Sequence, residues 1–492
     1  MTEFTRGRSD DAIPARRTSL RESRRVAGGT VWLKLWLLLP DTDATWDFQT
    51  RTKFIAPCDN EEMWLDQHTK LYLGLAFAAG ILITLGYKDF YPDLERRYHD
   101  RLRKNRTRRR SSTQVSLQVN EPQHDSPAAP QPATAIREGI EGAIGNTPLI
   151  RIKSLSDATG CDILAKAEFL NAAGNSPKDR VALSMIQMAE AEGFLTPHSG
   201  DKVYEGTVGS TGISLAAICR ARGYTAHICM PDDVAIEKSD LLLRLGAVVE
   251  RVRPASIVDK GQFVNMARAR AQQHTSDPDQ KGRGFFADQF ENPANYLAHL
   301  HGTGREIFEQ TGGQLDAFVA GAGTGGTISG CALYLKPRLP NMKVVLADPQ
   351  GSGLYNKVKH GVMFSPTEKE GTRRRHQVDS IVEGIGVNRV THNFEAGREL
   401  VDDAVKVTDD QALMMARWLV ERDGLFVGSS SAVNCVAAVK TAMELGAGHR
   451  VVTILCDSGT RHLSKFWAKA GTIGGDDEMT MDAILNPKIS DS

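Results

Sequence analysis

Short apolar segments alternate with helical patterns from Ile136 to roughly Gly471, and this alternation is the strongest constraint on how the chain can fold. The predicted strands are Ile163–Ala167, Val203–Glu205, Ala226–Met230, Val248–Val252, Ala317–Ala320, Val344–Ala347 and Val451–Leu455. Helical patterns lie between most of them, at 212–222, 236–245, 293–310, 411–422 and 432–445. The alternation predicts wound α/β sheets, whose ligands bind at the loops beyond the carboxyl ends of the strands.

Length and charge narrow the class of protein further. The chain has 492 residues, more than one hydrophobic core usually holds, which predicts two domains plus extensions. Its 60 Lys and Arg residues balance 60 Asp and Glu residues, so the net charge gives no reason to expect a nucleic-acid partner. The cysteines show no CxxC pairs and no metal-type spacing, which indicates reduced thiols and predicts no metal site.

The run from 71 to 87 is uncharged and apolar, and it is just shorter than the roughly 20 residues that span a bilayer. It predicts a transmembrane anchor at 69–88, with a buried core helix as the alternative. Arginines and lysines concentrate after the run, between 96 and 110, so the positive-inside rule places the C-terminal part in the cytosol. Such a span resembles the signal anchors of mitochondrial outer-membrane proteins, with the endoplasmic reticulum as the alternative.

Four other segments complete the predicted domain plan. Residues 1–68 form an N-terminal extension whose arginines suggest a transit peptide, although its acidic residues oppose that assignment. Residues 89–135 are basic and then rich in Pro, Ser and Gln, which predicts a disordered tether. We expect a catalytic region at 136–475, with a smaller subdomain at about 180–300 inserted in the larger one, and a tail at 476–492.

Lys178 lies at the start of a predicted helix, in the segment 175–180 (NSPKDR). Pro177 suits a first helical turn, because its missing N–H has no partner there. Apolar side chains then recur at helical spacing, at Val181, Met185 and Met188. A positive helix end disfavours an ammonium relative to a neutral amine or an imine, as a Schiff-base lysine requires. Taken alone, Lys178 is more readily explained as an ordinary solvated lysine.

Two glycine-rich loops follow predicted strands and precede predicted helices. The loop 206–212 (GTVGSTG) offers N–H groups and three hydroxyls to an anion, with a flexible connection as the alternative. The loop 321–327 (GAGTGGT) has four glycines that let a phosphate approach both the backbone and the helix end. This loop also contains G-x-G-x-x-G, and Asp348 ends the next strand, so by itself it does not separate NAD from a phosphorylated cofactor.

Eight motifs occur together in the order found in one known family. They are IGNTPLI (144–150), SPKDR (176–180), GTVGSTG (206–212), DQFENPAN (288–295), GAGTGGT (321–327), EGIG (383–386), GSSSA (428–432) and CDSG (456–459). Over residues 136 to about 470 they resemble the cysteine synthase and cystathionine β-synthase family of fold-type-II pyridoxal-phosphate (PLP) enzymes, and within it the fungal, membrane-anchored, mitochondrial cysteine synthase-like branch. The implied fold is α/β and tryptophan synthase β-like, with two wound domains after one transmembrane helix.

The resemblance implies a role for individual residues. Lys178 would carry the cofactor as a Schiff base, and Ser210 would face the cofactor ring. Ser458, a turn serine when taken alone, would bond the pyridine nitrogen. The cofactor phosphate would be held by Gly323, Thr324, Gly325, Gly326 and Thr327. The substrate carboxylate would be bound by Thr207, Gly209, Thr211 and Gln289.

The implied reaction is β-replacement of O-acetylserine by sulfide. The amino acid displaces Lys178 from the cofactor, the freed amine removes the α-proton, acetate leaves, and sulfide adds to give cysteine. The alternatives within PLP chemistry are cystathionine β-synthase, serine dehydratase and cysteine desulfhydrase activity. Those outside it are an NAD-binding protein and a catalytically weakened membrane scaffold. A homodimer is expected from the family.

The sequence departs from the family at two positions of the hydroxyl-rich loop. Ser210 stands where the family has an asparagine, and Val208 stands where it has a serine. Because serine lacks the amide group, the contact to the ring oxygen of the cofactor would be lost or made through water. The segment 383–386 (EGIG) is more similar to cystathionine β-synthase. These departures leave the expected fold and cofactor unchanged and concern the substrate and the rate.

Overall fold

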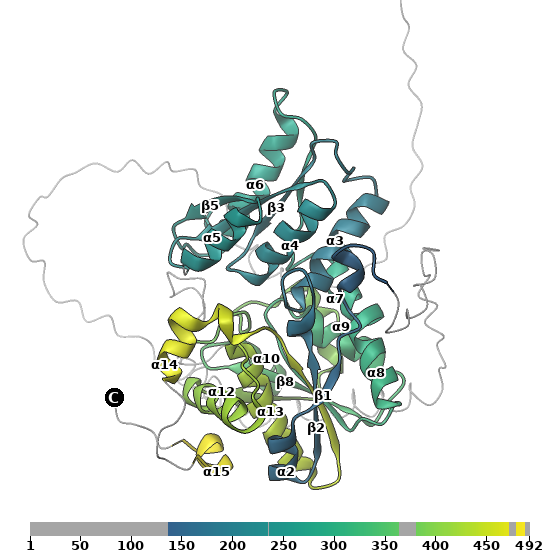
Figure 1. Ribbon diagram of the computed structural model, residues 1–492, viewed down its shortest axis with the longest axis vertical. Helices are drawn as coiled ribbons and strands as arrows, with labels where there is room; N and C mark the ends of the chain where they lie inside the picture. Colours follow the sequence, from purple (N-terminus) through teal and green to yellow (C-terminus); the bar gives the residue numbers. More distant parts are fainter. Residues whose placement is uncertain (1–135, 235, 364–379, 472–478, 488–492) are drawn as a thin grey trace, which may run out of the picture. The chain divides into compact units, whose positions relative to one another are not determined.

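The computed structural model describes residues 136–234, 236–363, 380–471 and 479–487 (Figure 1). None of the helices in these ranges is long and apolar enough to cross a membrane. The expected anchor at 69–88, the extension at 1–68 and the tether at 89–135 lie outside the described residues, so all three remain predictions.

The larger sheet has six strands in the order β1-β2-β10-β7-β8-β9. All neighbours run parallel except β1, which is antiparallel to β2. The central strands read as unbroken apolar runs because both of their faces are covered. Val451 of β10, for example, belongs to one core and Val452 to the other. The strands are β1 (Leu149–Arg151), β2 (Asp162–Ala167), β7 (Ala317–Gly321), β8 (Lys343–Pro349), β9 (Asp403–Val407) and β10 (Arg450–Leu455).

The smaller sheet has four strands in the order β5-β4-β3-β6, all parallel. They are β3 (Lys202–Gly206), β4 (Thr225–Pro231), β5 (Val248–Val252) and β6 (Gly284–Phe286). One face packs on α3, α4 and α5, and the other face packs on α6 (Figure 1). Both sheets are therefore layered between helices, as the alternation of strands and helices predicts.

The helices connect the strands in chain order. The α-helices are α2 (Lys153–Thr159), α3 (Lys178–Ala191), α4 (Ser210–Ala221), α5 (Ile236–Arg244), α6 (Phe263–Ser276), α7 (Ala294–Ala298), α8 (Arg305–Thr311), α9 (Gly326–Leu335), α10 (Leu354–His360), α11 (His392–Glu395), α12 (Asp409–Asp423), α13 (Ser429–Leu445), α14 (Ala468–Ala470) and α15 (Met481–Leu485). The 3-10 turns are η1 (Glu141–Ala143), η2 (Glu168–Leu170), η4 (Arg398–Leu400) and η5 (Gly459–Arg461). Two π-helical turns are η3 (His299–Gly304) and η6 (Leu463–Trp467).

The larger sheet separates two hydrophobic cores. On one face, α2, α12 and α13 contribute Leu155, Met415 and Val436. On the other face, α8 and α9 contribute Ile307 and Ile328. Because these helices lie flat on the sheet, the loops beyond the carboxyl ends of the strands remain uncovered and are available for a ligand.

Each of the seven predicted strands is present, with bounds within two residues of those expected. Three strands were missed, and two of them have only three residues, too few to show a periodic pattern. The predicted helix at 293–310 is helical along its length, but it is interrupted by the π turn η3 between α7 and α8. The π turn lies against Gly330 of α9, where a Cβ would lie 2.7 Å from the Cβ of His299 and 2.8 Å from the backbone nitrogen of Leu300. This close approach of two helices has no signature in a single helical pattern.

Candidate active site

A cavity of about 300 Å³ lies where loops from both sheets meet. Its lining includes Lys178 at the start of α3, residues 207–211 between β3 and α4, and most of 321–327 between β7 and α9. Cys456 and Asp457, just beyond β10, complete this wall. The loop segments follow the carboxyl ends of parallel strands, so the topology itself brings these distant stretches of sequence together.

Lys178 is the first residue of α3, and its half-buried side chain lines the cavity. Burial lowers the pKa of Lys178, and nearby Cys456 and Asp457 offset this effect only in part. Within the described ranges its Nζ makes no hydrogen bond and no ion pair. An amine with a lowered pKa and no fixed partner can serve as a nucleophile and as a base.

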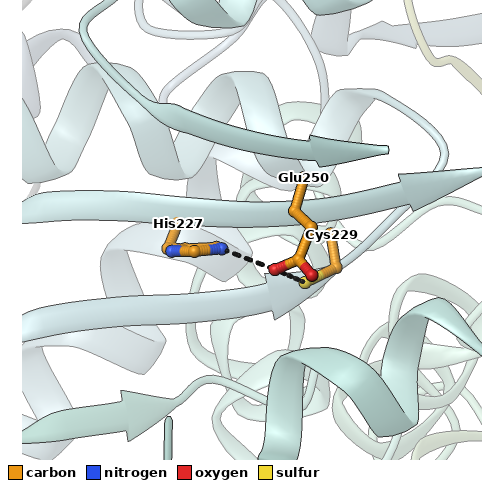
Figure 2. Close-up of side chains that lie close together, drawn as sticks. All are labelled: His227, Cys229 and Glu250. Atoms are coloured by element: carbon orange, nitrogen blue, oxygen red, sulfur yellow. Dashed lines mark hydrogen bonds and ion pairs between the residues drawn. The ribbon is translucent and has the colours of Figure 1, made fainter. Parts of the chain in front are cut away.

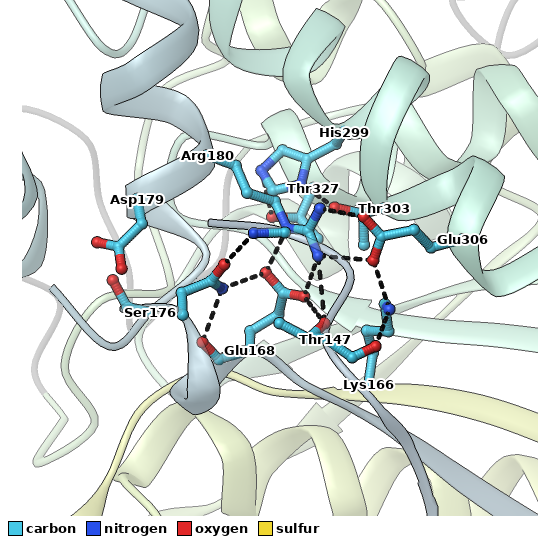
Figure 3. A network of polar contacts seen from close by, with 12 residues as sticks. Thr147, Lys166, Glu168, Ser176, Asp179, Arg180, His299, Thr303, Glu306 and Thr327 are labelled. Atoms are coloured by element: carbon cyan, nitrogen blue, oxygen red, sulfur yellow. Dashed lines mark hydrogen bonds and ion pairs between the residues drawn. The ribbon is translucent and has the colours of Figure 1, made fainter. Parts of the chain in front are cut away.

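A buried network of four charges fixes the start of α3 (Figure 3). Arg180 lies between Glu168 and Glu306, with N–O distances of 2.7 and 2.6 Å. Lys166 Nζ lies 2.5 Å from the other oxygen of Glu306. Burial alone would raise the pKa of Glu306, yet Arg180 and Lys166 lower it to about 2, so the carboxylate is ionised. Two cations and two carboxylates balance, and they tie the helix of Lys178 to β2 and α8.

The loop 321–327 has a conformation that only glycine allows at two positions. Gly325 has a φ of +85°, and a Cβ on it would lie 2.5 Å from the Cβ of Phe394. A Cβ on Gly323 would lie 2.2 Å from the carbonyl oxygen of Gly384. The loop leads directly into α9, whose first N–H groups have no acceptor within the helix. These features are typical of a phosphate cradle.

Two threonine side chains of the same loop line the cavity and are held from behind. Asn295 Nδ2 donates to Thr324 Oγ1 at 2.9 Å. Thr327 Oγ1 lies 3.2 Å from Nε2 of His299 (Figure 3). Burial lowers the pKa of His299 to about 3, so its ring is neutral. Of the expected phosphate-binding residues, Gly326 is buried and is not part of the cavity lining.

The expected carboxylate-binding residues Thr207, Gly209, Thr211 and Gln289 all line the cavity, as does Ser210, which was expected to face the cofactor ring. Thr211 Oγ1 donates to Gln289 Oε1 at 2.5 Å. Gln289 Nε2 donates in turn to Oε1 of the buried Glu205 at 3.1 Å. Burial and nearby Asp288 raise the pKa of Glu205 to about 8, so this carboxyl group is neutral and adds no negative charge behind the loop.

Besides Gly326, two more residues singled out in the sequence do not line the cavity. The half-buried Ser458 accepts a hydrogen bond from the Thr460 N–H at 3.3 Å, while Cys456 and Asp457 occupy the wall beside it. Asp348 is buried and accepts from the Tyr355 N–H at 2.7 Å. Asp348 is therefore engaged with α10 instead of facing the cavity beside the glycine loop, which removes the main argument for a dinucleotide.

Sequence analysis missed a charged pair at the cavity. Lys238 Nζ, from α5, lies 2.5 Å from Oε2 of Glu383, and both residues line the cavity. Although burial opposes the shift, Lys238 lowers the pKa of Glu383. Glu383 was noted only as part of the 383–386 motif. Lys238 carried no signal, because a lysine in the first turn of an amphipathic helix is typical of a solvent-exposed face.

These residues fit a phosphorylated aldehyde cofactor. A poised lysine amine, a glycine-rich helix start and a hydroxyl-rich loop surround one cavity, and each supplies the donor that one part of such a cofactor or its amino-acid substrate requires. A dinucleotide would need neither the amine nor the second loop. The geometry thus favours PLP over NAD.

Comparisons with known proteins agree with this geometry. The family described as pyridoxal-phosphate dependent enzyme matches residues 140–457. The chain is 65% identical over 434 residues to Cysteine synthase 2 of Emericella nidulans, covering 86% of this chain and 99% of the relative. A Saccharomyces cerevisiae relative with a provisional name as a mitochondrial cysteine synthase is 54% identical over 352 residues, covering 71% of this chain and 88% of the relative.

One solved structure extends the likeness to three dimensions. The crystal structure of an O-acetylserine dependent cystathionine β-synthase from Helicobacter pylori matches with a TM-score of 0.56 at 32% identity, covering 67% of this chain and 98% of that chain. Family, relatives and fold point the same way, and this chain belongs to the pyridoxal-phosphate dependent enzymes.

Proposed function

We propose that this chain is a cysteine synthase that converts O-acetyl-L-serine and sulfide into L-cysteine and acetate. The observation that supports this most is the cavity itself, which brings a lysine amine of lowered pKa, a hydroxyl-rich loop and a glycine cradle to one place. The 65% identity to a relative named Cysteine synthase 2 favours cysteine synthesis over the other reactions considered.

In this proposal different residues of the cavity wall bind different parts of the cofactor. Lys178 would bind its aldehyde, and Ser210 would face its ring. Ser458 would reach the ring nitrogen by a change of rotamer, because its hydroxyl now accepts from the Thr460 N–H. The phosphate would be held by Gly323, Thr324, Gly325, Gly326 and Thr327. Pyridoxal phosphate, when bound, supplies an electron sink that acidifies the α-proton of an amino acid.

The chain's own groups would orient the substrate and move the proton. Thr207, Gly209, Thr211 and Gln289 would bind the carboxylate of O-acetylserine and so fix its α-carbon. The neutral Glu205 behind Gln289 helps, because an ionised carboxylate there would repel the substrate. Lys178 Nζ, whose pKa is lowered by burial, would accept the α-proton. Departure of acetate then opens the β-carbon to sulfide.

The test is a paired assay on purified protein supplied with PLP. O-acetylserine plus sulfide should give cysteine much faster than serine plus homocysteine gives cystathionine. A faster second reaction would instead support cystathionine β-synthase activity, and release of pyruvate from serine alone would support a dehydratase. No turnover with any of these substrates, despite a normal cofactor spectrum, would support a catalytically weakened scaffold.

We also propose that the enzyme is anchored in the mitochondrial outer membrane through residues 71–87, with residues 136–475 in the cytosol. The support is the uncharged run and the basic residues that follow it. The provisional name of the Saccharomyces cerevisiae relative agrees with a mitochondrial location. The endoplasmic reticulum is the alternative that fractionation would separate. A homodimer is proposed by analogy with the family.

A further inference from the structure

Three polar side chains lie together on the face of the smaller sheet that α6 covers, outside the cavity (Figure 2). His227 and Cys229 are two residues apart on β4, so their side chains share a face of the sheet. Glu250 of β5 is the register partner of Cys229. The strand pairing therefore sets the cluster without help from any flexible loop.

The three possible ligand atoms lie close to one another. His227 Nε2 is 3.1 Å from Glu250 Oε2, and Cys229 Sγ is 3.9 Å from the same oxygen. All three atoms fall within 4.8 Å of one another. Ligand bonds of about 2.0–2.3 Å around tetrahedral zinc place neighbouring ligand atoms roughly 3.3–3.7 Å apart. Small side-chain movements would bring the cluster to that spacing.

We propose that His227, Cys229 and Glu250 form a Zn²⁺ site with a fourth position open to water. Imidazole, thiolate and carboxylate are the ligands that zinc takes, and three protein ligands are typical of a site that keeps one open position. The ring of Tyr204, from β3, stacks on His227 with centroids 4.9 Å apart and holds the imidazole plane. His227 and Glu250 are each partly exposed, which gives an ion a route to the buried Cys229.

Arg270 of α6 competes with this ion for the carboxylate of Glu250. Its Nε and one terminal nitrogen donate to the two carboxylate oxygens of Glu250, at 3.0 and 2.7 Å. The Arg270 side chain is 40% exposed, so it can turn toward solvent when an ion arrives. Zinc takes the thiolate of Cys229, so its binding releases the thiol proton to solvent. The displacement of Arg270 and the release of the thiol proton each lower the affinity for zinc, but the three ligands stay in place.

The position of the cluster connects it to the substrate loop. The carbonyl oxygen of Cys229 accepts a hydrogen bond from the Thr207 N–H at 3.0 Å. None of the three ligands lines the cavity, so an ion at the cluster does not displace the cofactor. The cysteine spacing that predicted no metal site could not show this cluster, because its ligands come from two strands and include only one cysteine.

The test uses the full-length holoprotein in detergent, freed of metal with a chelator. It is titrated with Zn²⁺ against a chromophoric chelator, and Co²⁺ is used to detect the thiolate-to-metal charge-transfer band. Ligand variants are Cys229→Ser and His227→Gln, and the competitor variant is Arg270→Gln. The matched control is Cys219→Ser, because Cys219 is an equally buried thiol on α4 outside the cluster.

We expect one Zn²⁺ per chain and a cobalt–thiolate band that Cys229→Ser abolishes. Each ligand variant should lose more than the roughly 10–100-fold in affinity that removing an outer partner of a metal ligand costs. Arg270→Gln should tighten binding, and Cys219→Ser should leave it unchanged. The proposal is overturned if zinc binds without one-to-one stoichiometry, if Cys229→Ser binds as the wild type does, or if Arg270→Gln does not tighten binding. Because Arg270 is on the surface, its variant decides the question even if a ligand variant misfolds.

Discussion

At the scale of single residues, the chemistry depends on the amine of Lys178. Lys178→Ala should lose the visible absorption of the bound cofactor aldehyde and show no spectral response to O-acetylserine. Activity should fall by on the order of 10³-fold or more, since this group both holds the cofactor and moves the proton. Lys153→Ala is the matched control, because Lys153 also begins a helix but is exposed. An unchanged spectrum in Lys178→Ala would refute the role.

Sequence reasoning identified Lys178, but it gave only part of the physical reason for its reactivity. The predicted cause of a lowered pKa was the positive end of a helix. In the structure the largest cause is burial, produced by loops from both sheets that close around the side chain. Burial of this kind depends on segments almost 300 residues away, at Cys456, so the local sequence could not show it.

Glu306 carries a prediction about stability and pH. Glu306→Gln leaves the buried cations Arg180 and Lys166 with one carboxylate, and it should destabilise the fold by about 3–5 kcal/mol near pH 7. The pKa of Glu306 is lowered to about 2, so its contribution is complete above the ordinary carboxyl pKa of about 4.5 and is lost as the pH falls toward 2. Urea unfolding should therefore show a difference in the free energy of unfolding between wild type and variant, and this difference should narrow below about pH 4.5. A difference that stayed constant with pH would contradict the ionised network.

At the scale of elements, the turn before α9 allows a sharp test. Gly325→Ala places a Cβ against Phe394 in a backbone conformation that alanine rarely adopts, so the turn must shift. Cofactor affinity should drop by at least about tenfold, while the far-ultraviolet circular dichroism of the apoprotein stays unchanged. Gly312→Ala is the control, because Gly312 also has a positive φ, but a Cβ there would have no neighbour within 4 Å. Equal losses in both variants would mean that backbone strain alone explains the effect.

The pair between α5 and the 383–386 segment predicts a change in substrate binding. Lys238→Met removes the ion pair that joins Glu383 to α5 of the smaller sheet. Glu383 keeps its ion pair with Lys465. The KM for O-acetylserine should rise roughly five- to tenfold, the equivalent of about 1–1.4 kcal/mol, with a smaller change in kcat. Lys465→Met is the control, because Lys465 is 47% exposed and lies 3.3 Å from the other oxygen of Glu383. A larger effect from Lys465→Met would contradict this assignment.

Elements with strong periodicity could be predicted, and short or irregular ones could not. The strands at 317–320 and 451–455 were recognised because buried parallel strands are largely apolar runs. β9 was missed, because its Asp and Lys interrupt the run. α6 was missed as well, because its buried face is narrow and consists mainly of Val264, Ala267 and Ala271, which give a weak helical pattern among many polar residues. Because α6 was missed, the sequence could not show that Arg270 lies beside the proposed zinc site.

At the scale of the whole molecule, the sequence predicts which loops matter but not how they share one cavity. The motifs singled out the loops at 206–212 and 321–327, and residues of both loops line the cavity. They could not show that Lys238 would join the wall, because its place depends on how the two sheets face each other, a tertiary property with no local pattern. The hydroxyl of Ser458 instead accepts from the Thr460 N–H two residues further on, as the local interpretation of a turn serine predicts.

The proposed N-terminal anchor leads to the last prediction, because it would separate membrane attachment from catalysis. The described residues from 136 onward belong to one compact unit, so a chain that begins at Glu121 should bind PLP and retain activity within about twofold. Carbonate extraction should leave the full-length chain in the membrane and release the shortened one. Ala78→Arg with Ile81→Arg should also release the full-length chain, since each arginine at the centre of a span costs about 2.5–3.5 kcal/mol. If carbonate released the unmodified full-length chain, the 71–87 run would not be a membrane anchor, and the catalytic proposal would stand unaffected.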